Sequence, residues 1–599
     1  MELQDIENAQ NLVGLFLQRA DELGDKPFLT AKTEGEWRPV SYAQAAERVC
    51  LMAEQLVAMG MKPGDRIMLV SENRPEWVIA DLAIMAAGCI TTPAYTTNTE
   101  GDHAHILDDS GARTVIVSNT KLAQTLFAAM WRAGHGEHVI AIDAISNAQK
   151  GSFAIHQWQD MMKGDAAAAR AAVEKRITGF TRDDMACIIY TSGTSGSPRG
   201  VMLHHGAILH NCLAAGGPLT MDFGWSEERF LSFLPMSHAL EHTAGIYLPL
   251  SLGADIWFSE GLDKLSSNLT EAQPTFMIVV PRMFELLRGK IIKAVEKQGG
   301  IANYLLDKAV AMGERQIAGK KSLMDIPIGL LLGRTLRPKI RETFGGRIKA
   351  LVSGGAPLNP EVGGFFQAMG LVMLQGYGQT ETAPVVACNF PSAGIRLNTV
   401  GPPLKGVEAR IAEDGEILIR GECVMKGYWN NPEATKAALP EDWLHTGDIG
   451  HFDEDGRIVI TDRKKDIIVN DKGDNIAPQK LEGMLTLQPE VMQAMVSGDK
   501  RPYMVGLIVP DPEWEKQWAR ENGHAGADGA ALREIPEFAK AIKAAVDRTN
   551  KDLSVIEKVR KFTVADEPFT VENDQMTPTL KIRRPFIREK YQERIEALY

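Results

Sequence analysis

Residues 188 to 201 read Ile188-Ile189-Tyr190-Thr191-Ser192-Gly193-Thr194-Ser195-Gly196-Ser197-Pro198-Arg199-Gly200-Val201. The apolar run from 185 to 190 predicts a short buried strand, and a helix is expected over 201–215. The loop between them consists almost wholly of Thr, Ser and Gly, whose backbone N–H and hydroxyl groups can approach an anion closely. Arg199 adds a cation. The Gly-Lys-Ser/Thr ending of a Walker loop is absent. The composition of the loop therefore does not by itself decide between a polyphosphate-binding loop and an exposed turn, and the other segments of the chain must decide.

Four further apolar segments have the length of buried strands, and each ends in a turn rich in Gly, Pro, Ser or Thr. They span 230–234, 276–280, 350–353 and 371–374. In open α/β sheets, ligands bind beyond the carboxyl ends of the strands. We therefore expect these turns to meet in one composite site.

The N-terminal part alternates helical and strand-like patterns. Apolar residues at helical spacing predict a helix over 12–23, and Ser41 is a suitable cap for a second helix that reaches about residue 59. Short apolar strands are expected at 66–70 and 114–117. This alternation predicts parallel βαβ units in a layered α/β domain.

The sequence pattern changes twice in the second half of the chain. Residues 284–344 predict a long, mainly helical stretch with many basic side chains, and the pattern beyond about residue 400 is typical of β-strands. The run Asp462-Arg463-Lys464-Lys465-Asp466, taken alone, is typical of an exposed linker. The remainder, 463–599, alternates strands and helices and is expected to form a small domain of its own.

Bulk properties exclude several classes of protein. With 599 residues the chain predicts several domain-sized units, and its net charge of −12 argues against nucleic-acid binding and a polybasic membrane anchor. Its six cysteines are scattered, which predicts neither disulfides nor a structural zinc site and fits a reducing compartment. Signal peptide and transmembrane patterns are absent. We expect a cytoplasmic protein without a transmembrane segment.

Single residues at other turns suggest nucleotide chemistry. Glu381 could ligate Mg²⁺ beside phosphates, because that ion prefers oxygen ligands. Tyr377 could stack on a base, and Asp448 could accept hydrogen bonds from ribose hydroxyls. Each residue alone also fits a solvated turn, and Lys581 in its basic stretch fits a solvated surface.

One motif points to different chemistry. His238-Ala239-Leu240-Glu241-His242 matches the H-x-x-E-H pattern of inverted zinc proteases. The preceding Pro235 indicates a turn at a strand end, and so short a pattern arises by chance in a long chain. We therefore favour ordinary pocket or core histidines over a zinc site.

Five motifs in a fixed order resemble those of the adenylate-forming enzymes, a superfamily of acyl-CoA synthetases, peptide-synthetase adenylation domains and luciferases. The loop at 190–200 resembles the family's phosphate loop. The later motifs are Gly354-Gly355-Ala356-Pro357-Leu358, Gly376-Tyr377-Gly378-Gln379-Thr380-Glu381, Trp443-Leu444-His445-Thr446-Gly447-Asp448 and Asp462-Arg463-Lys464-Lys465-Asp466. The resemblance spans nearly the whole chain and favours the polyphosphate interpretation of the loop.

Within that superfamily the chain is most similar to long-chain fatty-acid–CoA ligases. The segment 279–285 with the basic helical stretch after it, Asn475-Ile476-Ala477-Pro478, and the ending Thr577-Pro578-Thr579-Leu580-Lys581 carry this similarity. The resemblance implies an α/β fold with a large N-terminal domain (1–462), made of two layered α/β subdomains plus a β-barrel. It also implies a small mobile α+β C-terminal domain (463–599).

The resemblance further implies a two-step reaction that uses ATP, Mg²⁺ and coenzyme A. A fatty acid attacks the α-phosphate of ATP to give acyl-adenylate and pyrophosphate, and the thiol of coenzyme A then displaces AMP. Residues implied to bind ATP are Thr191, Ser192, Gly193, Thr194, Ser195, Gly196, Gly355, Ala356, Pro357, Gln375, Gly376, Tyr377, Gly378, Thr380, Asp448 and Arg463.

The resemblance also assigns catalytic, pocket and hinge roles. Catalytic roles fall on Lys581, Thr380, Glu381 and Arg199, with Glu381 the Mg²⁺ ligand. The acyl pocket or pantetheine tunnel is expected at His238, Gly354 and Val280. The C-terminal domain is expected to rotate about Lys465 and withdraw Lys581.

One departure and several alternatives remain at this stage. Arg199 stands where the family usually has Lys, and it keeps the positive charge on a bulkier group. The alternatives are adenylation of an aromatic acid or of an acid destined for a carrier protein, a light-emitting oxidase, and a nucleotide-binding scaffold. Sequence leaves open the acyl chain length, a homodimeric state and peripheral membrane contact.

Overall fold

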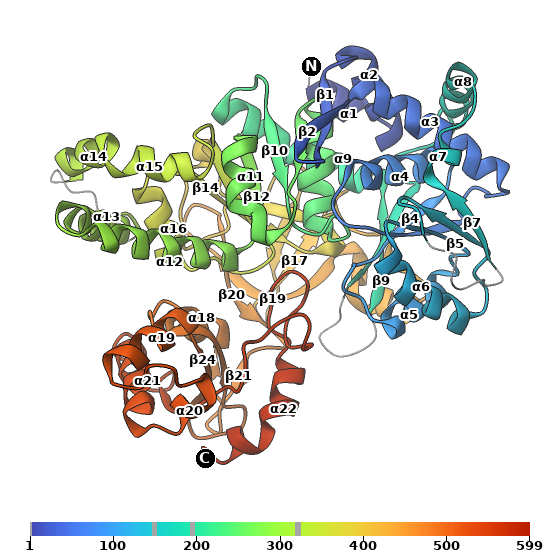
Figure 1. Cartoon of the computed structure of the whole chain (residues 1–599). Coiled ribbons are helices and arrows are strands. Elements are labelled where there is room, and N and C mark those ends of the chain that lie inside the picture. Colours follow the sequence, from blue (N-terminus) through green and yellow to red (C-terminus); the bar gives the residue numbers. More distant parts are fainter. Residues whose placement is uncertain (1–2, 146–152, 192–197, 318–324) are drawn as a thin grey trace.

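The computed structural model describes residues 3–145, 153–191, 198–317 and 325–599. Figure 1 shows a broad N-terminal part built on two large sheets, with the C-terminal domain lying against one side of it. The predicted alternation of helix and strand is confirmed throughout the N-terminal part. Among the described residues, none of the helices combines the length and apolar composition needed to cross a lipid bilayer.

The first large sheet has eight strands and is parallel except at its two edges. The four predicted strands that end in polar turns are neighbours within it, which confirms that their carboxyl ends share one edge. In spatial order the strands are β15 (Val385–Cys388), β14 (Met373–Gly378), β13 (Ala350–Ser353), β12 (Phe276–Val279), β10 (Arg229–Ser232), β11 (Asp255–Phe258), β1 (Pro27–Thr33) and β2 (Glu36–Ser41).

The second large sheet also has eight strands, antiparallel at one end and parallel across the rest. In spatial order they are β18 (Gly427–Tyr428), β9 (Arg199–His204), β8 (Met185–Thr191), β4 (Ile90–Pro93), β3 (Arg66–Val70), β5 (Thr114–Val117), β6 (His138–Ala141) and β7 (Ala154–Gln157). One apolar core contains Leu29 of the first sheet together with Ile67 and Ile189 of the second. The two sheets therefore pack as one body.

The helix expected over 201–215 is wrong in its first turn. Residues Arg199–His204 form strand β9, which pairs antiparallel with β8 so that Thr191 faces Arg199. Helix α9 begins only at His205 and extends to Phe223. The segment 192–198 therefore joins two strands of a hairpin.

The helices of the N-terminal part surround these sheets, and their ends follow local chemistry. Ser41 and Gln44 form the capping box that starts the second predicted helix. The helices are α1 (Leu3–Asn8), α2 (Leu12–Leu23), α3 (Tyr42–Ala58), α4 (Pro75–Ala86), α5 (Glu100–Ser110), α6 (Thr120–Ala133), α7 (Trp158–Met161), α8 (Ala166–Ile177), α9 (His205–Phe223), α10 (Leu248–Ser251), α11 (Leu265–Ala272), α16 (Pro360–Ala368) and α17 (Pro432–Ala438).

The predicted basic helical stretch is confirmed as four helices that project from the first sheet (Figure 1). They are α12 (Pro281–Gln298), α13 (Ile301–Ile317), α14 (Asp325–Arg334) and α15 (Leu336–Thr343). Phe284 of α12 and Phe366 of α16 pack in a second apolar core against this face of the sheet.

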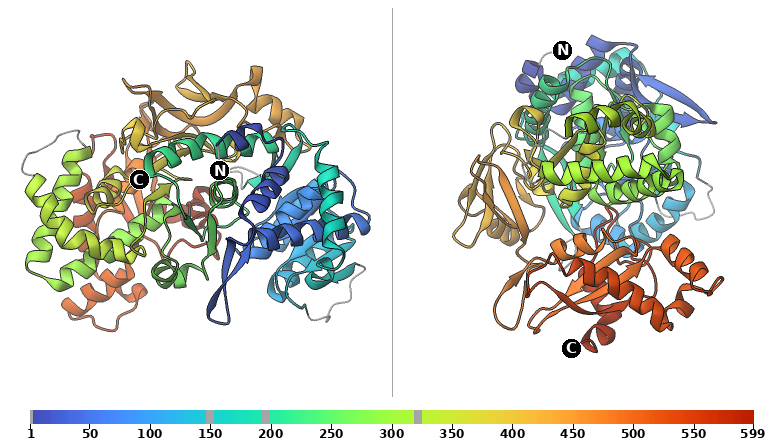
Figure 2. Two further views of the ribbon diagram at one scale, coloured as in Figure 1. Left: turned by 90° about the horizontal axis from the view of Figure 1, so that it is seen from above. Right: turned by 90° about the vertical axis from the view of Figure 1, so that its left-hand side faces the viewer.

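The β-like region beyond 400 forms a four-stranded antiparallel sheet along one side of the large sheets (Figure 2). Its strands are β16 (Glu408–Ile411), β17 (Glu416–Arg420), β19 (Leu444–Phe452) and β20 (Ile458–Arg463). This sheet stands where the resemblance implied a barrel. Its described pairings leave β16 and β20 as the two edges.

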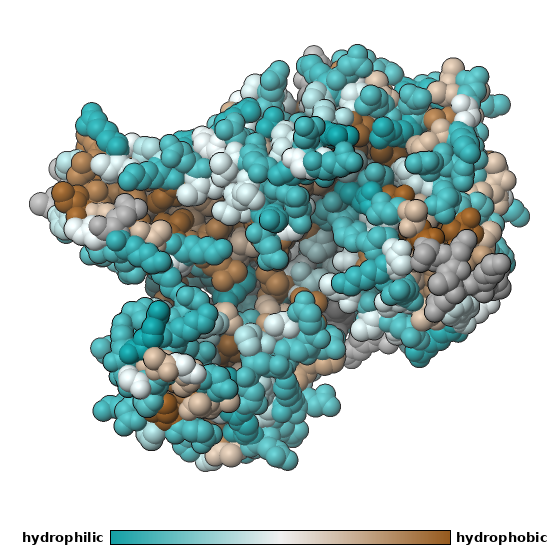
Figure 3. Space-filling model, viewed as in Figure 1, coloured by the Kyte–Doolittle hydropathy of each residue, from teal (hydrophilic) through white to brown (hydrophobic). Residues whose placement is uncertain are grey.

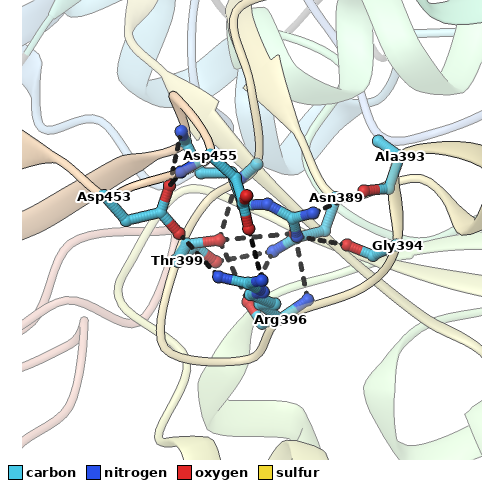
Figure 4. Close-up of polar contacts among 9 residues, drawn as sticks. Asn389, Ala393, Gly394, Arg396, Thr399, Asp453 and Asp455 are labelled. Carbon is cyan, nitrogen blue, oxygen red and sulfur yellow. Dashed lines mark hydrogen bonds and ion pairs between the residues drawn. The ribbon is translucent and has the colours of Figure 1, made fainter.

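A polar joint ties this third sheet to the loop after β15 (Figure 4). The Arg457 guanidinium donates to the carbonyls of Ala393 and Gly394, and Arg396 pairs with Asp453 and Asp455 in the turn between β19 and β20. Arg457 is buried, so its two carbonyl partners have little access to water.

The C-terminal domain contains a two-stranded sheet, β21 (Ile468–Val469) and β22 (Asn475–Ile476), and a three-stranded sheet, β23 (Val491–Ser497), β24 (Met504–Pro510) and β25 (Val559–Val564). Alternate residues of β24 enter two different cores, with Met504 in one and Val505 in the other, as the strand period of two requires. Its helices are α18 (Pro478–Leu485), α19 (Pro512–Glu521), α20 (Gly529–Arg533), α21 (Pro536–Thr549) and α22 (Arg584–Glu596).

Two predicted boundaries shift. Strand β14 continues through Gly378 because β15 pairs with it, so the motif at 376–378 lies in a strand rather than in a turn. The charged run was expected to be a linker, yet Asp462 and Arg463 end strand β20 and pair with β19. The predicted division of the chain at 462/463 stays a prediction.

Candidate active site

A cavity of about 1930 Å³ lies where the two large sheets, the third sheet and the C-terminal domain meet. The residues predicted for the site that line it are Thr191, Arg199, His238, Gly354, Gly355, Ala356, Pro357, Gln375, Gly376, Tyr377, Gly378, Thr380, Glu381, Asp448, Arg463, Lys465 and Lys581. Residues Ser192, Gly193, Thr194, Ser195 and Gly196 lie outside the described part of the chain. The structure thus brings together residues that are spread over nearly four hundred positions of the sequence.

One corner of the cavity holds a buried carboxylate with two defined partners. The Tyr377 hydroxyl donates to Oδ2 of Asp448 at 2.7 Å, and Nε of Arg463 donates to Oδ1 at 3.0 Å. Asp448 and Arg463 face each other across the β19–β20 ladder, which fixes their separation. Burial raises the pKa of Tyr377 well above its usual value, so the phenol stays protonated and donates.

A second polar group lies between the first and second sheets. The Tyr428 hydroxyl donates to Oε1 of Glu381 at 2.9 Å, and the Arg199 guanidinium lies 5.1 Å from the centre of the Tyr428 ring. The backbone N–H of Met425 also donates to the Glu381 carbonyl. Strand β18 therefore links the predicted metal ligand to the strand that follows the phosphate loop. Tyr428 was not predicted from the sequence, because it belongs to none of the five motifs.

Lys581 reaches this cavity from a tight turn of the C-terminal domain. The N–H of Thr577 donates to the Lys581 carbonyl at 2.8 Å, and the Lys581 N–H donates to Oγ1 of Thr577 at 3.1 Å. Burial, together with the nearby Arg463 charge, lowers the pKa of Lys581 to about 8, although the charges of Asp448 and Asp466 oppose this shift. The nearby acidic side chains therefore do not fully offset the loss of hydration that the Lys581 amine suffers on burial.

Leu580, the residue before this lysine, has an unusual backbone conformation. Its φ of 61° lies in the left-handed region, which disfavours residues that carry a Cβ. Its side chain packs against the core of α12–α16 and also against a core of the C-terminal domain. The leucine therefore contacts both domains directly beside Lys581.

His238 lies in the same cavity as a neutral imidazole. The backbone N–H of Leu240 donates to its Nδ1 at 3.1 Å, so in the neutral ring the proton is assigned to Nε2. Burial and, to a smaller extent, the Lys581 charge lower its pKa to about 3. This places a neutral N–H donor close to a cation.

Two glycines of the motif at 354–358 allow close approach of neighbouring side chains. A Cβ at Gly354 would lie 3.3 Å from Leu240, and Gly355 has a φ of 81°. Val280 was predicted to line the pocket, but it lies behind this motif, where it is buried in the second core. The cavity wall at that point is formed by Pro281 and Arg282 instead.

An apolar branch extends from the cavity between α9, the π-helix Glu241–Tyr247 and the first sheet. Its lining includes Ala215, Leu219, Phe230, Ala244, Leu248, Phe276, Ile278, Cys388 and Phe390. Sequence reasoning predicted none of these as pocket residues, because each has the pattern of an ordinary core residue.

The H-x-x-E-H segment has a different arrangement from a metal site. His242 is buried and its Nε2 lies 3.0 Å from Asp81, whereas His238 faces the cavity. Burial raises the pKa of Glu241 to about 8, which disfavours the carboxylate form that a metal requires. No cluster of three His, Cys, Asp or Glu side chains able to hold a metal occurs within the described ranges.

One cavity thus holds both the Tyr377–Asp448–Arg463 group and a set of apolar lining residues, and the comparisons with known proteins identify an adenylate-forming enzyme. The chain belongs to the AMP-binding enzyme family, in the branch of long-chain-fatty-acid–CoA ligases. The AMP-binding enzyme model matches residues 16–429, and the model of the AMP-binding enzyme C-terminal domain matches 465–599. The family and branch predicted from the motifs are confirmed.

The curated relatives cover nearly the full chain. The long-chain-fatty-acid–CoA ligase FadD15 of Mycobacterium tuberculosis is 34% identical over 578 residues, which is 94% of this chain and 93% of the relative. Long chain acyl-CoA synthetase 1 of Arabidopsis thaliana is 32% identical, over 93% of this chain and 87% of the relative. Human long-chain-fatty-acid–CoA ligase 6 is 30% identical, over 99% and 87%.

Solved structures share the fold. The adenylation domain of a carboxylate reductase from Mycobacterium chelonae superposes with a TM-score of 0.78 at 22% identity, and the match covers 100% of this chain and 92% of that one. The anthranilate CoA ligase AuaEII, solved with anthranoyl-AMP, gives a TM-score of 0.72 at 18% identity, over 98% and 99%. Both matches confirm the predicted architecture of a large N-terminal domain followed by a small C-terminal one.

Proposed function

We propose that this protein is an ATP-dependent, AMP-forming long-chain fatty-acid–CoA ligase. The observation that carries the proposal is the convergence of Lys581, the Tyr377–Asp448–Arg463 group and the apolar branch in one cavity. The names of the curated relatives supply the long-chain acid and coenzyme A as substrates. The apolar branch is consistent with an alkyl chain, because it is lined by aliphatic and aromatic side chains.

In the first step, a carboxylate oxygen of the acid forms a bond to the α-phosphorus of ATP while the bond to the bridging β-phosphate oxygen breaks. Both reactants are anions, so charge neutralisation and positioning dominate the barrier. Lys581 is suited to hold the carboxylate and the α-phosphate together, with Thr380 at the same phosphate. The Nε2–H of His238 is suited to orient the carboxylate.

The remaining nucleotide contacts follow from the polar corner. Asp448, held by Tyr377 and Arg463, presents oxygens suited to ribose hydroxyls. The chain at 354–357 and 375–378 flanks the position proposed for adenine. Arg199 and Thr191, at the two ends of the hairpin loop, are suited to hold the leaving pyrophosphate together with residues 192–196.

A magnesium ion fits the residues present. Glu381 offers a carboxylate that lines the cavity and is held by Tyr428. Mg²⁺ is commonly bound by one or two carboxylates together with substrate phosphates, so one protein carboxylate is enough. When bound, the ion would neutralise phosphate charge.

In the second step, the thiol sulfur of coenzyme A attacks the acyl carbon, AMP leaves, and a thioester forms. We propose that the C-terminal domain rotates about Lys465 between the steps, which withdraws Lys581 and opens a path for the thiol. A cytoplasmic location and a homodimeric state stay predictions. All six cysteines are buried and unpaired, which is consistent with a reducing compartment.

The test is pyrophosphate release from ATP by the purified full chain in the presence of Mg²⁺ and a panel of short-, medium- and long-chain fatty acids and aromatic acids. Release with long-chain acids, and formation of acyl-CoA when coenzyme A is added, is the expected result. Release only with aromatic acids would reassign the substrate. No release with any acid would reject the ligase assignment.

A further inference from the structure

Helix α5 presents two polar side chains to the hairpin of strands β8 and β9. His105 and Asp109 are four residues apart, which places them on one side of the helix. Nε2 of His105 donates to the Pro198 carbonyl oxygen at 2.8 Å, and Oδ2 of Asp109 accepts from the Tyr190 hydroxyl at 2.6 Å. The carbonyl can only accept, so the proton of the neutral His105 ring is assigned to Nε2. These two hydrogen bonds, the α5 contacts, hold both strands of the hairpin to one helix.

The α5 contacts fall next to two residues that line the cavity. Tyr190 directly precedes Thr191, and Pro198 directly precedes Arg199, and these two cavity residues face each other in the β8–β9 ladder. Tyr190 is only 4% exposed. Burial raises its pKa well above the usual value, so the phenol stays protonated and donates to Asp109. Loss of either contact would therefore act directly beside Thr191 or Arg199.

The backbone at the end of α5 also holds strand β18. The last four carbonyls of an α-helix have no partner within the helix, and the carbonyl of Asp109 is one of them. It accepts from Nε1 of Trp429 at 2.9 Å and from Nδ2 of Asn430 at 2.8 Å. The Trp429 N–H donates in turn to the Gly200 carbonyl at 2.7 Å. Gly200 follows Arg199, so both chain neighbours of this cation are held, one by α5 itself and one through Trp429.

Close packing keeps the hairpin in place against α5. A Cβ at Gly200 would lie 3.1 Å from the Tyr190 ring, and the His105 ring meets the Tyr190 ring edge-on with the centroids 6.2 Å apart. Asp108 of the same helix is exposed, and Figure 3 shows mainly hydrophilic side chains over the region where Figure 1 places α5. Helix α5 thus has one solvated side and one side packed on the hairpin.

We propose that His105 and Asp109 are positioning residues of the ATP site, which set where Thr191 and Arg199 meet the phosphates. The inference rests on the proposed function, which assigns Thr191 and Arg199 to the leaving pyrophosphate. His105 and Asp109 do not themselves line the cavity, so their effect on the reaction passes through the hairpin. A displacement of about 1 Å at a reacting group costs up to about a hundredfold in rate, so such contacts can govern the reaction from outside the site.

The two half-reactions of the purified full chain test this role. His105→Leu removes the donor to the Pro198 carbonyl. Asp109→Leu removes the acceptor of the Tyr190 hydroxyl but keeps the backbone carbonyl that holds β18. Each variant should lower kcat/KM for MgATP in adenylation about tenfold, the effect of one lost hydrogen bond, with KM for the acid unchanged. Thioester formation from preformed acyl-adenylate should be unchanged, because pyrophosphate has already left at that stage.

Conservative variants test the hydrogen bonds themselves. His105→Gln keeps an N–H donor of similar reach and should stay within about threefold of the unmodified kcat/KM for MgATP. Tyr190→Phe removes the donor together with its need for a partner. It should therefore lose less than Asp109→Leu, which leaves a buried hydroxyl unpaired. A glutamine variant as slow as His105→Leu would reject the hydrogen bond to Pro198 as the cause.

Matched variants near α5 control for nonspecific effects. Nε2 of His135 also lies next to an α5 carbonyl, 3.2 Å from the Leu107 oxygen, and Asp108 is the exposed neighbour of Asp109. His135→Leu and Asp108→Leu should leave kcat/KM for MgATP as in the unmodified protein. Equal losses in both half-reactions of His105→Leu, together with a lower urea midpoint, would make the α5 contacts purely structural and overturn the proposal.

Binding of MgATP without an acid separates this inference from the proposed function. Calorimetric titration should give a Kd for MgATP about tenfold higher in His105→Leu than in the unmodified protein, and an unchanged Kd in His135→Leu. If no acid supports pyrophosphate release, the ligase assignment fails, whereas the difference in Kd still tests the α5 contacts. An active ligase in which His105→Leu changes neither Kd nor kcat/KM would retain the function and reject the positioning role.

Discussion

At the scale of single residues, Lys581 is a cation brought into a cavity that already contains Arg463. Its lowered pKa, about 8, means that proton loss begins near neutral pH before substrates bind. Only the protonated amine neutralises the reacting anions. The adenylation kcat/KM should therefore fall as pH rises through about 8, because that parameter reports the free enzyme.

Lys581→Arg tests this assignment, because a guanidinium stays protonated throughout the range. We expect a lower maximum rate but no alkaline decline in pyrophosphate release between pH 7 and about 9.5. An unchanged alkaline limb in this variant would assign the titration to another group. Stopped assays with saturating Mg²⁺ measure both profiles.

Leu580 contributes a positioning role that its motif does not suggest. Its left-handed backbone would suit glycine, yet the leucine side chain contacts the cores of both domains. Leu580→Ala should slow adenylation by about tenfold, since it removes the apolar contact beside Lys581. Thioester formation from preformed acyl-adenylate should be unaffected.

Leu580→Gly distinguishes the effect of the leucine side-chain contacts from the effect of the backbone conformation. Glycine relieves the unfavourable φ but restores no side chain, so this variant should adenylate as slowly as Leu580→Ala. Full activity of the glycine variant would show that only the backbone conformation matters. Lys581→Ala provides the reference for complete loss of the lysine.

At the scale of elements, the joint between the third sheet and the loop after β15 depends on one buried guanidinium. Arg457→Leu leaves the Ala393 and Gly394 carbonyls without their donor in a buried setting. We expect a loss of about 2 kcal/mol in unfolding free energy, seen as a lower urea midpoint. Arg560→Leu, at an exposed position of β25, should leave the midpoint nearly unchanged.

Helices and strands that are marked by neighbouring residues in the chain were predictable from the sequence. Those that depend on pairing with a strand elsewhere in the chain were not. Ser41 with Gln44 marks a helix start by itself, and the strand at 66–70 needs only its apolar run. Val201, Met202 and Leu203 form an apolar run that fits a helix or a strand equally well. Pairing with β8 decides for the strand, and sequence alone does not reveal that pairing.

The same reason explains the errors at β14 and in the pocket. Gly376 and Gly378 are typical turn residues, but the partner strand β15 keeps them extended. Phe230 and Phe276 have the pattern of core residues, and only the packing of α9 and the π-helix leaves a cavity beside them. Val280 was predicted as the last residue of its strand and as a pocket residue, but β12 ends at Val279 and the next residue along, Pro281, lines the cavity instead.

At the scale of the whole molecule, the C-terminal domain is held with Lys581 in the cavity. Asn359 of the large domain donates to the Gly483 carbonyl at 3.2 Å, and a Cβ at Gly483 would lie 3.6 Å from that amide nitrogen. A disulfide between Asn359→Cys and Gly483→Cys, once its formation is verified, would link the two domains at this contact. The six native cysteines are buried, so the background of other disulfides should be low.

The oxidised double variant should release about one pyrophosphate per enzyme and then stop, because the crosslink prevents the rotation proposed for thioester formation. Reduction with dithiothreitol should restore acyl-CoA turnover. Each single-cysteine variant serves as a control under the same oxidising conditions. Full turnover by a protein shown to be crosslinked would contradict the rotation.

The motifs predicted which residues share the site, because their order resembles that of a known family. They did not predict how the site is assembled. Tyr428 and Leu580 act at contacts between sheets or domains, and neither contact has a local sequence pattern. Geometry between distant segments is therefore what the structure adds.

Strand β18 also has a consequence for solubility. It is only Gly427–Tyr428, yet it covers the outer edge of β9. An uncovered edge presents free N–H and C=O groups to which another chain can add a strand. A fragment that ends before 427 would leave the edge of β9 open in this way. Such a fragment should aggregate, and the loss of soluble protein would prevent any measurement of its catalytic activity.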